Sequence, residues 1–145
     1  MKNDVLFFPW QTRTQSTIFS NGDSQNTKQI ANSGLDKDGI DTDSNLLSLV
    51  VNQLDTVDNI ISLFFTDGTG LYPFFQCALP AVNPTTGKWN TYNILYLLTQ
   101  QNLIVKDSFG NGFIHIPKGW RLLASLQLPC SVQGTITTIA TLEDF

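Results

Sequence analysis

The sequence predicts an all-β protein: an antiparallel, jelly-roll-like β-sandwich with one short helix and an extended N-terminal arm. Composition is the first reason. Only 14% of the residues are charged and Glu143 is the single glutamate, so Ser, Thr, Asn and Gln supply most of the polarity. Thr and Asn favour strands and turns, whereas the helix formers Glu and Lys are scarce.

The second reason is the alternation of apolar residues between Phe113 and Phe145. In two runs of this segment, every second residue falls on one mostly apolar side, which is typical of strands that are half-buried in a two-layer sheet. The first run contains Trp120, Leu122, Ala124, Leu126 and Leu128, and the second contains Ile136, Thr138, Ala140 and Leu142.

The chain divides into two parts by pattern. Residues 1–44 are mostly polar and lack a sustained period, so we expect an extended arm or loop region with one or two strands. Residues 45–145 carry dense strand signals and are expected to form the β-sandwich domain. A chain of 145 residues is long enough for one ordinary core.

Strands are predicted in order from Asn45 onward. The first has Leu47, Leu49 and Val51 on one face, and the second has Ile61, Leu63 and Phe65 on one face. A tight turn containing Asp67-Gly68 follows, and the third strand is expected over Leu71 to Leu79. Because proline cannot donate to a ladder, Pro73 predicts an edge or a bulge there.

One helix is expected after the loop from Pro80 to Asn90. Ile94, Leu95, Leu97 and Leu98 are three and four residues apart, and Thr91 is the predicted cap. Strands then resume at Leu103 to Val105 and at Phe113 to Ile116, with a turn at Asp107 to Gly112. The total is six to eight strands, enough for two packed sheets.

Charge and sequence patterns exclude several classes of protein. The net charge is −4 and the eight Lys and Arg residues are scattered along the chain, so we expect no basic patch that could bind nucleic acid. No long apolar run or conventional secretion signal is visible, so we expect neither a membrane partner nor export. We expect synthesis in a cytoplasm. Cys77 alternates with Phe75 and Leu79, which favours a buried free thiol, and we assign no disulfide.

No side chain is clearly placed for catalysis, so we expect no enzyme and no cofactor. His115 is the sole histidine and lies between Ile114 and Ile116, which favours a partly exposed strand residue over a catalytic one. The remaining acids form no specific pair for sugar hydrolysis: Asp67 and Asp107 are expected in turns, and Glu143 and Asp144 at a frayed end.

One acidic cluster leaves calcium open. Asp36, Asp38, Asp41 and Asp43 provide oxygen ligands around Gly39, but their spacing is short for an EF-hand and no Glu closes the loop. A solvated loop fits the same residues, and we assign no metal site.

One leucine and three aromatic residues near the start are the candidate partner-binding residues. They are Leu6, Phe7, Phe8 and Trp10. Aromatic side chains bury much area at interfaces, so these residues are expected either to anchor the chain on a neighbouring subunit or partner, or to close its own core.

From about residue 45 onward, the order of segments resembles a family of small β-sandwich proteins encoded beside the capsid genes of tailed bacteriophages. The segments that carry the resemblance are Leu46 to Gln53, Asp55-Thr56-Val57, Ser62 to Gly68, Leu79-Pro80-Ala81, the Tyr92 to Leu98 helix, Asp107 to Gly112, Ile116 to Leu122, and Ile139 to Phe145.

Members of this family are, or are presumed to be, capsid cement or decoration proteins. The resemblance implies a virion protein that binds the outer surface of a phage head and reinforces contacts between major capsid subunits. It implies assembly in the host cytoplasm, location on the capsid surface, and self-association as a homo-oligomer, with a trimer favoured. The alternative is a glycan-binding or adhesin-like sandwich on a phage tail, with Trp89, Tyr92 and Trp120 stacking on sugar.

Overall fold

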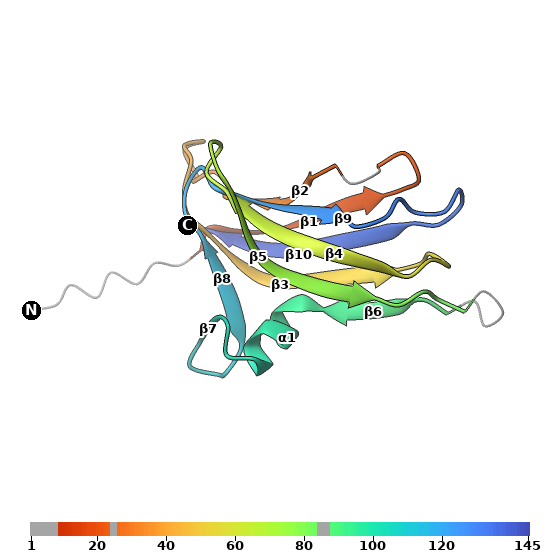
Figure 1. Ribbon diagram of the computed structural model, residues 1–145. Coiled ribbons are helices and arrows are strands. Elements are labelled where there is room, and N and C mark those ends of the chain that lie inside the picture. Colours follow the sequence, from red (N-terminus) through yellow and green to blue (C-terminus); the bar gives the residue numbers. More distant parts are fainter. Residues whose placement is uncertain (1–8, 24–25, 84–87) are drawn as a thin grey trace, which may run out of the picture.

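The computed structural model describes residues 9–23, 26–83 and 88–145, which form two antiparallel β-sheets and one short helix (Figure 1). Sheet A contains β1 (Gln11–Phe19), β3 (Ser44–Gln53), β6 (Asn90–Asn93), β7 (Val105–Lys106), β8 (Gly112–Ile116) and β10 (Ile136–Asp144). Sheet B contains β2 (Lys28–Asn32), β4 (Asn59–Thr66), β5 (Leu71–Leu79) and β9 (Arg121–Leu126). The helix α1 spans Ile94–Gln100.

The strands pair in a nested order. β1 pairs with β10, β2 with β9, β3 with β8 and β4 with β5, all antiparallel. Further pairing of β10 with β3 and of β9 with β4 joins these hairpin-like pairs into the sheet orders β1-β10-β3-β8 and β2-β9-β4-β5. These eight strands wrap into a jelly roll, to which sheet A adds β7 beside β8 and β6 beside β3, so the predicted fold class is confirmed.

The first strands belong to the sandwich itself. β1 pairs with β10 over nine successive positions, from Gln11 with Asp144 to Phe19 with Ile136. Phe19 and Ile30 are fully buried in the core. β1 and β2 are therefore part of the sandwich rather than a separate arm, and the boundary expected between residues 44 and 45 does not divide the structure. Their partners lie far along the chain, which is why local pattern alone made them look like an arm.

The alternation expected in the last strands is largely confirmed. Leu122, Ala124 and Leu126 in β9 are buried, as are Ile136, Thr138, Ala140 and Leu142 in β10. The two ends of the first run differ from the prediction because they lie outside β9. Trp120 precedes the strand and is partly buried against the core, and Leu128 follows it and is 45% exposed.

A bulge changes the face of one predicted core residue. Ser48 pairs with Thr141 and Leu46 pairs with Leu142, so Leu47 is the extra residue in β3. Leu46 and Leu49 are therefore buried, whereas Leu47 is 40% exposed, contrary to the alternation expected from Leu47. A second bulge lies in β5, where Leu63 pairs with Phe75 and Phe64 with Pro73. β5 is also the edge of sheet B, so the prediction from Pro73 is confirmed.

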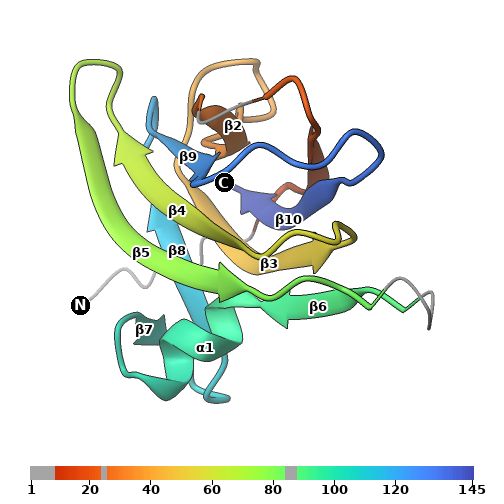
Figure 2. The ribbon, with the colours of Figure 1, turned by 45° about the vertical axis from the view of Figure 1, so that its right-hand side comes forward.

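The helix follows β6 directly and lies beside the lower end of β8 (Figure 2). Its N-cap is Asn93, whose side chain accepts a hydrogen bond from the Tyr96 amide, rather than the expected Thr91, which is in β6. Ile94, Leu95 and Leu98 are buried. Cys77 and Cys130 are both buried free thiols, as expected for Cys77.

Candidate functional site

His115, on β8, lies in a hollow at the end of the sandwich where β3 begins. Its Nδ1 is 3.0 Å from Oδ1 of Asn45, and its Nε2 is 3.3 Å from Oδ2 of Asp43. The His115 side chain is 50% exposed, which confirms the predicted exposed strand position. The Lys118 amide donates to Oδ1 of Asp43. Each ring nitrogen of His115 thus has an oxygen atom beside it. Together with the Lys118 bond, these contacts join β8 and the turn after it to Asp43 and Asn45.

The acidic loop from Asp36 to Asp43 is arranged for its own turn. Oδ1 of Asp36 accepts hydrogen bonds from the amides of Asp38 and Ile40, at 2.8 and 3.0 Å, and Gly39 has a positive φ of 81°. Asp43 instead contacts His115 and Lys118. Among the residues that the structure describes, no three His, Cys, Asp or Glu side chains gather as metal ligands.

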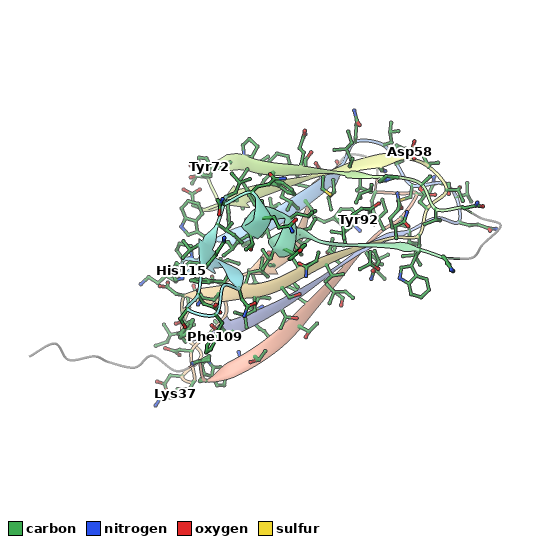
Figure 3. The ribbon with its side chains drawn as sticks, turned by 90° about the horizontal axis from the view of Figure 1, so that it is seen from below. Lys37, Asp58, Tyr72, Tyr92, Phe109 and His115 are labelled. Atoms are coloured by element: carbon green, nitrogen blue, oxygen red, sulfur yellow. The ribbon has the colours of Figure 1, made fainter. Side chains whose placement is uncertain are left out.

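A larger groove adjoins this hollow and shares Asn45 and Phe145 with it. Its volume is about 770 Å³. The walls come from the segment before β1, from β10, β3 and β8, from the β7–β8 turn and from α1. The lining residues include Pro9, Leu47, Tyr96, Thr99, Phe113, Glu143 and Phe145. Figure 3 shows His115 and Phe109, which is in the β7–β8 turn, at the same end of the molecule, opposite Asp58.

Several polar groups in the groove already have hydrogen-bond partners in this chain. Oδ1 of Asn93 caps α1, and the Thr99 hydroxyl donates to the Leu95 carbonyl at 2.6 Å. Oδ1 of Asp107 accepts from the amides of Phe109 and Asn111, as expected for an Asp in a turn. Asn45 donates to Glu143 at 3.3 Å. Many polar side chains of this surface thus already have hydrogen-bond partners in the same chain.

Asp144, expected at a frayed end, is instead fully buried at the end of β10. Its Oδ2 accepts from Arg13 Nε at 2.8 Å and from Gln11 at 2.7 Å, and its Oδ1 accepts from the Ser44 hydroxyl at 2.5 Å. Burial acts to raise the pKa of Asp144, but these hydrogen bonds and the Arg13 charge outweigh it and lower the pKa. Sequence reasoning missed this cluster because its members are joined only by strand pairing.

The aromatic residues of the glycan alternative lie apart. Trp89 is 59% exposed beside Asn90, which pairs with Gln53 at the end of β3. Trp120 bonds through its carbonyl to Ser33, near the start of β3, and its ring stacks on Tyr72 at 5.9 Å. A strand of this length spans about 30 Å, so the two indoles do not form one sugar platform. Tyr92 is partly buried against the core.

Of the four predicted partner-binding residues, Leu6, Phe7 and Phe8 lie outside the described residues. Trp10 directly precedes β1 and is 46% exposed. Its amide donates to the Asp144 carbonyl and its ring Nε1 donates to the Leu35 carbonyl at 2.8 Å. Trp10 therefore binds this chain's own backbone while half of its surface is open.

The outer face of sheet A is a broad surface with little charge. The alternation of β1, β10, β3 and β6 places hydroxyl, amide and aliphatic side chains on it. They are Thr12, Thr14, Ser16, Ile18, Thr137, Ile139, Thr141, Asn45, Leu47, Ser48, Val50, Asn52, Thr91 and Asn93. Glu143 is the one charged side chain of these strands on that face within the described part of the chain.

No protein-family model matches the chain, and no curated protein sequence matches it. Its fold is similar to that of a chain from the acidic stable capsid structure of Helicobacter pylori bacteriophage KHP30, with 10% identity and a TM-score of 0.53, over 94% of this chain and 90% of that chain.

Two other similar structures have TM-scores too low to support an argument. The Yersinia pseudotuberculosis-derived mitogen has 12% identity and a TM-score of 0.38, over 92% of this chain and 86% of that one. A chain of the virus-like particle of the giant freshwater prawn Macrobrachium rosenbergii extra small virus has 11% identity and a TM-score of 0.36, over 92% and 80%. The comparisons thus show a sandwich fold that also occurs in a phage capsid.

Proposed function

We propose that this chain is a virion structural protein, a cement or decoration protein that binds the outer surface of a phage head and stabilises contacts between major capsid subunits. The observation that carries the proposal is the jelly roll shared with the phage capsid chain over nearly the full length of both chains. The segment order from residue 45 onward, which resembles phage cement and decoration proteins, supports the same role.

The distribution of charge supports a role in assembly. The cores of protein interfaces are depleted in charged residues, and the outer face of sheet A has that composition. Charged residues such as Lys37, Asp58 and Lys118 lie in the turns and loops between strands. We assign to this face a contact with the major capsid protein or with further copies of this chain, a trimer being the proposed homo-oligomer.

The proposed role is mechanical and involves neither catalysis nor a cofactor. Many backbone hydrogen bonds and a continuous core hold the two layers of the sandwich together, so bound copies would resist relative movement of the subunits beneath them. Among the described residues, no helix has the length and apolar character needed to cross a membrane. The proposed location is the capsid surface, after assembly in the host cytoplasm.

Co-sedimentation tests the proposal. Shells assembled from the major capsid protein encoded in the same genome are mixed with the purified chain, pelleted, and heated to measure their disruption temperature. We expect the chain to pellet with the shells in a fixed ratio and to raise that temperature. Sedimentation velocity of the free chain is expected to show a trimer.

Two variants locate the contact. Ile139→Asp places a charge on the outer face of sheet A, where Ile139 is 37% exposed, and is expected to weaken pelleting. Val132→Asp, at an 85% exposed position in the loop before β10, is the matched control and is expected to pellet normally. Failure of the unmodified chain to bind shells contradicts the proposal, and strong binding on a glycan array would support the tail alternative instead.

A further inference from the structure

Two Asn-Gly dipeptides in the chain are candidates for a spontaneous chemical modification. They are Asn21-Gly22, in the turn after β1, and Asn111-Gly112, where the β7–β8 turn meets β8. In such a dipeptide the backbone nitrogen of glycine can attack the side-chain carbonyl carbon of asparagine, because glycine has no side chain to obstruct the approach. In a folded protein the reaction depends on how firmly these two groups are held.

The carboxamide of Asn21 is held by the fold. Its Nδ2 donates a hydrogen bond to the Cys130 carbonyl at 2.7 Å, in the loop between β9 and β10. A bond from the Asp23 amide to the Ser20 carbonyl closes the same turn. Asn21 must therefore lose its bond to Cys130 before its side chain can reach the Gly22 nitrogen.

The carboxamide of Asn111 is held less firmly. Asn111 is exposed at the groove beside α1, and its side chain makes no hydrogen bond within the described part of the chain. Its backbone is bonded to Asp107: the Asn111 amide donates to Oδ1 at 2.9 Å, and the Asn111 carbonyl accepts from the Asp107 amide at 2.8 Å. β7 has only two residues, Val105–Lys106, so opening this turn breaks few bonds.

The Gly112 nitrogen is also available for the reaction. Hydrogen-bonded and non-hydrogen-bonded pairs alternate along an antiparallel ladder. Because Asp107 and Asn111 are hydrogen-bonded, the next pair, Lys106 with Gly112, directs the Gly112 nitrogen away from β7. On the other side of β8, pairing with β3 extends only as far as Ile114. The Gly112 nitrogen is thus not tied to either neighbouring strand.

The packing of β8 against the helix requires glycine at position 112. An added Cβ would overlap Thr99 Oγ1 and Ile104 Cδ1. The Thr99 hydroxyl is itself fixed by its bond to the Leu95 carbonyl. The fold therefore keeps, next to Asn111, the one residue type that leaves the asparagine open to attack.

We propose that Asn111 is the site of spontaneous deamidation in the folded chain, limited by opening of the β7–β8 turn, and that the fold protects Asn21. The Gly112 nitrogen bonds to Cγ of Asn111, the C–N bond of the carboxamide breaks, and ammonia leaves with the proton from the Gly112 nitrogen. One water molecule then opens the resulting succinimide to aspartate or isoaspartate. The net reaction replaces the carboxamide by a carboxylate, consumes one water and releases ammonium.

The product adds a negative charge to the groove, which Asp107 and Glu143 also line. The neighbouring outer face of sheet A has little charge, so a new carboxylate there is expected to weaken a contact made by that face. This consequence rests on the proposed function, whereas the deamidation does not. The experiments below measure mass and need no capsid shells, so their failure is distinct from a failure of the chain to bind shells.

Peptide mapping by mass spectrometry, after incubation of the full chain in mildly alkaline buffer, tests the proposal. The native chain is compared with the chain in urea, where neither turn is formed and the two dipeptides should react at similar rates. In the native chain, Asn111 should react at least about fivefold faster than Asn21, because Asn21 must first lose a hydrogen bond. Equal native rates, faster reaction at Asn21, no reaction at Asn111, or the same preference in urea overturns the proposal.

Two aspartate variants test the role of the β7–β8 turn. Asp107→Ala removes the acceptor of the Phe109 and Asn111 amides, so it should accelerate the reaction at Asn111 by about fivefold and leave Asn21 unchanged. Asp67→Ala is the matched control, because it removes the corresponding acceptor in the β4–β5 turn and should leave both rates unchanged. No acceleration by Asp107→Ala, or equal acceleration by both variants, overturns the assignment of turn opening as the limiting step.

Discussion

Arg13 Nε donates a 2.8 Å hydrogen bond to Oδ2 of Asp144, joining the first strand to the last strand of the jelly roll. The same guanidinium donates to the side chain and backbone carbonyl oxygens of Asn32, at the end of β2 in the opposite sheet. Asp144 also accepts from Ser44, the first residue of β3. One buried carboxylate and one arginine thus connect four strands and both layers.

Asp144→Asn is expected to reduce the free energy of unfolding at pH 7 by about 3 kcal/mol, because it removes a buried charge partner of Arg13. The folded pKa of Asp144 is lowered, so its stabilisation is present above the unfolded pKa near 3.9 and is lost as the pH falls through the folded value. Urea unfolding between pH 7 and pH 2 should show the deficit of the variant shrinking below about pH 4. A deficit that does not change with pH contradicts this assignment.

Gly34→Ala is expected to destabilise the protein, because the added Cβ would overlap the carboxylate of Asp144. Neither group has room to move without breaking the hydrogen bonds around Asp144. We expect a loss of about 2–3 kcal/mol in denaturant unfolding. Gly22→Ala is the matched control, since a Cβ there meets nothing within 4 Å, and it should be close to neutral. If Gly34→Ala and Gly22→Ala had equal effects, the carboxylate of Asp144 could move away from the added Cβ without loss of stability, and the prediction would be wrong.

Deleting residues 1–20 is expected to prevent folding. The deletion removes β1 with its nine pairings to β10, together with the buried ring of Phe19. Deleting only residues 1–8 leaves β1 intact and should keep the β-type far-ultraviolet circular dichroism spectrum and a cooperative melt. A folded product of the longer deletion would contradict the role of β1 as a sandwich strand.

Trp120→Ala is expected to cost about 2–3 kcal/mol in free energy of unfolding, less than the 3–5 kcal/mol typical of a fully buried tryptophan. Trp120 is only partly buried, but it contacts the core and stacks on Tyr72. Trp89→Ala is the control, because Trp89 is 59% exposed, and its effect should be within about 0.5 kcal/mol. Equal losses from the two variants would be inconsistent with these positions.

Removing divalent cations is expected to leave the melting temperature unchanged. Asp36 uses Oδ1 for its own turn, and Asp43 contacts His115 and Lys118, so the acidic loop is closed without a metal. Melting scans with a chelator and with added calcium provide the measurement. A rise of several degrees in calcium would indicate a site formed by the four aspartates.

Predictions from local pattern succeeded where the determining interactions are local. The alternation from Ile136 to Leu142 identified the inner face of β10, because period-two burial is a property of any strand with one face in a core. Pro73 identified an edge with a bulge, since its missing amide hydrogen excludes regular pairing in a sheet interior. The helix was also found from its apolar spacing, with only its cap misplaced.

The candidate site was harder to predict. His115 was correctly placed on an exposed strand face, but its neighbours Asn45 and Asp43 come from the start of β3 and the loop before it. The groove depends on Leu47 facing outward, which a single bulge decides. An alternating sequence pattern does not reveal where a strand contains one extra residue. The register of β3 shifts at Leu47 only when β3 is paired with β10.

The sequence by itself determined the all-β class, the positions of most strands and the single helix, because composition, alternation and turn residues act within a few neighbours. Only the tertiary structure decided that residues 11–19 and 28–32 are strands of the sandwich and that Asp144 is buried beside Arg13. Those features depend on pairing between the two ends of the chain, and the free energy of such contacts appears only after the intervening strands have brought the ends together.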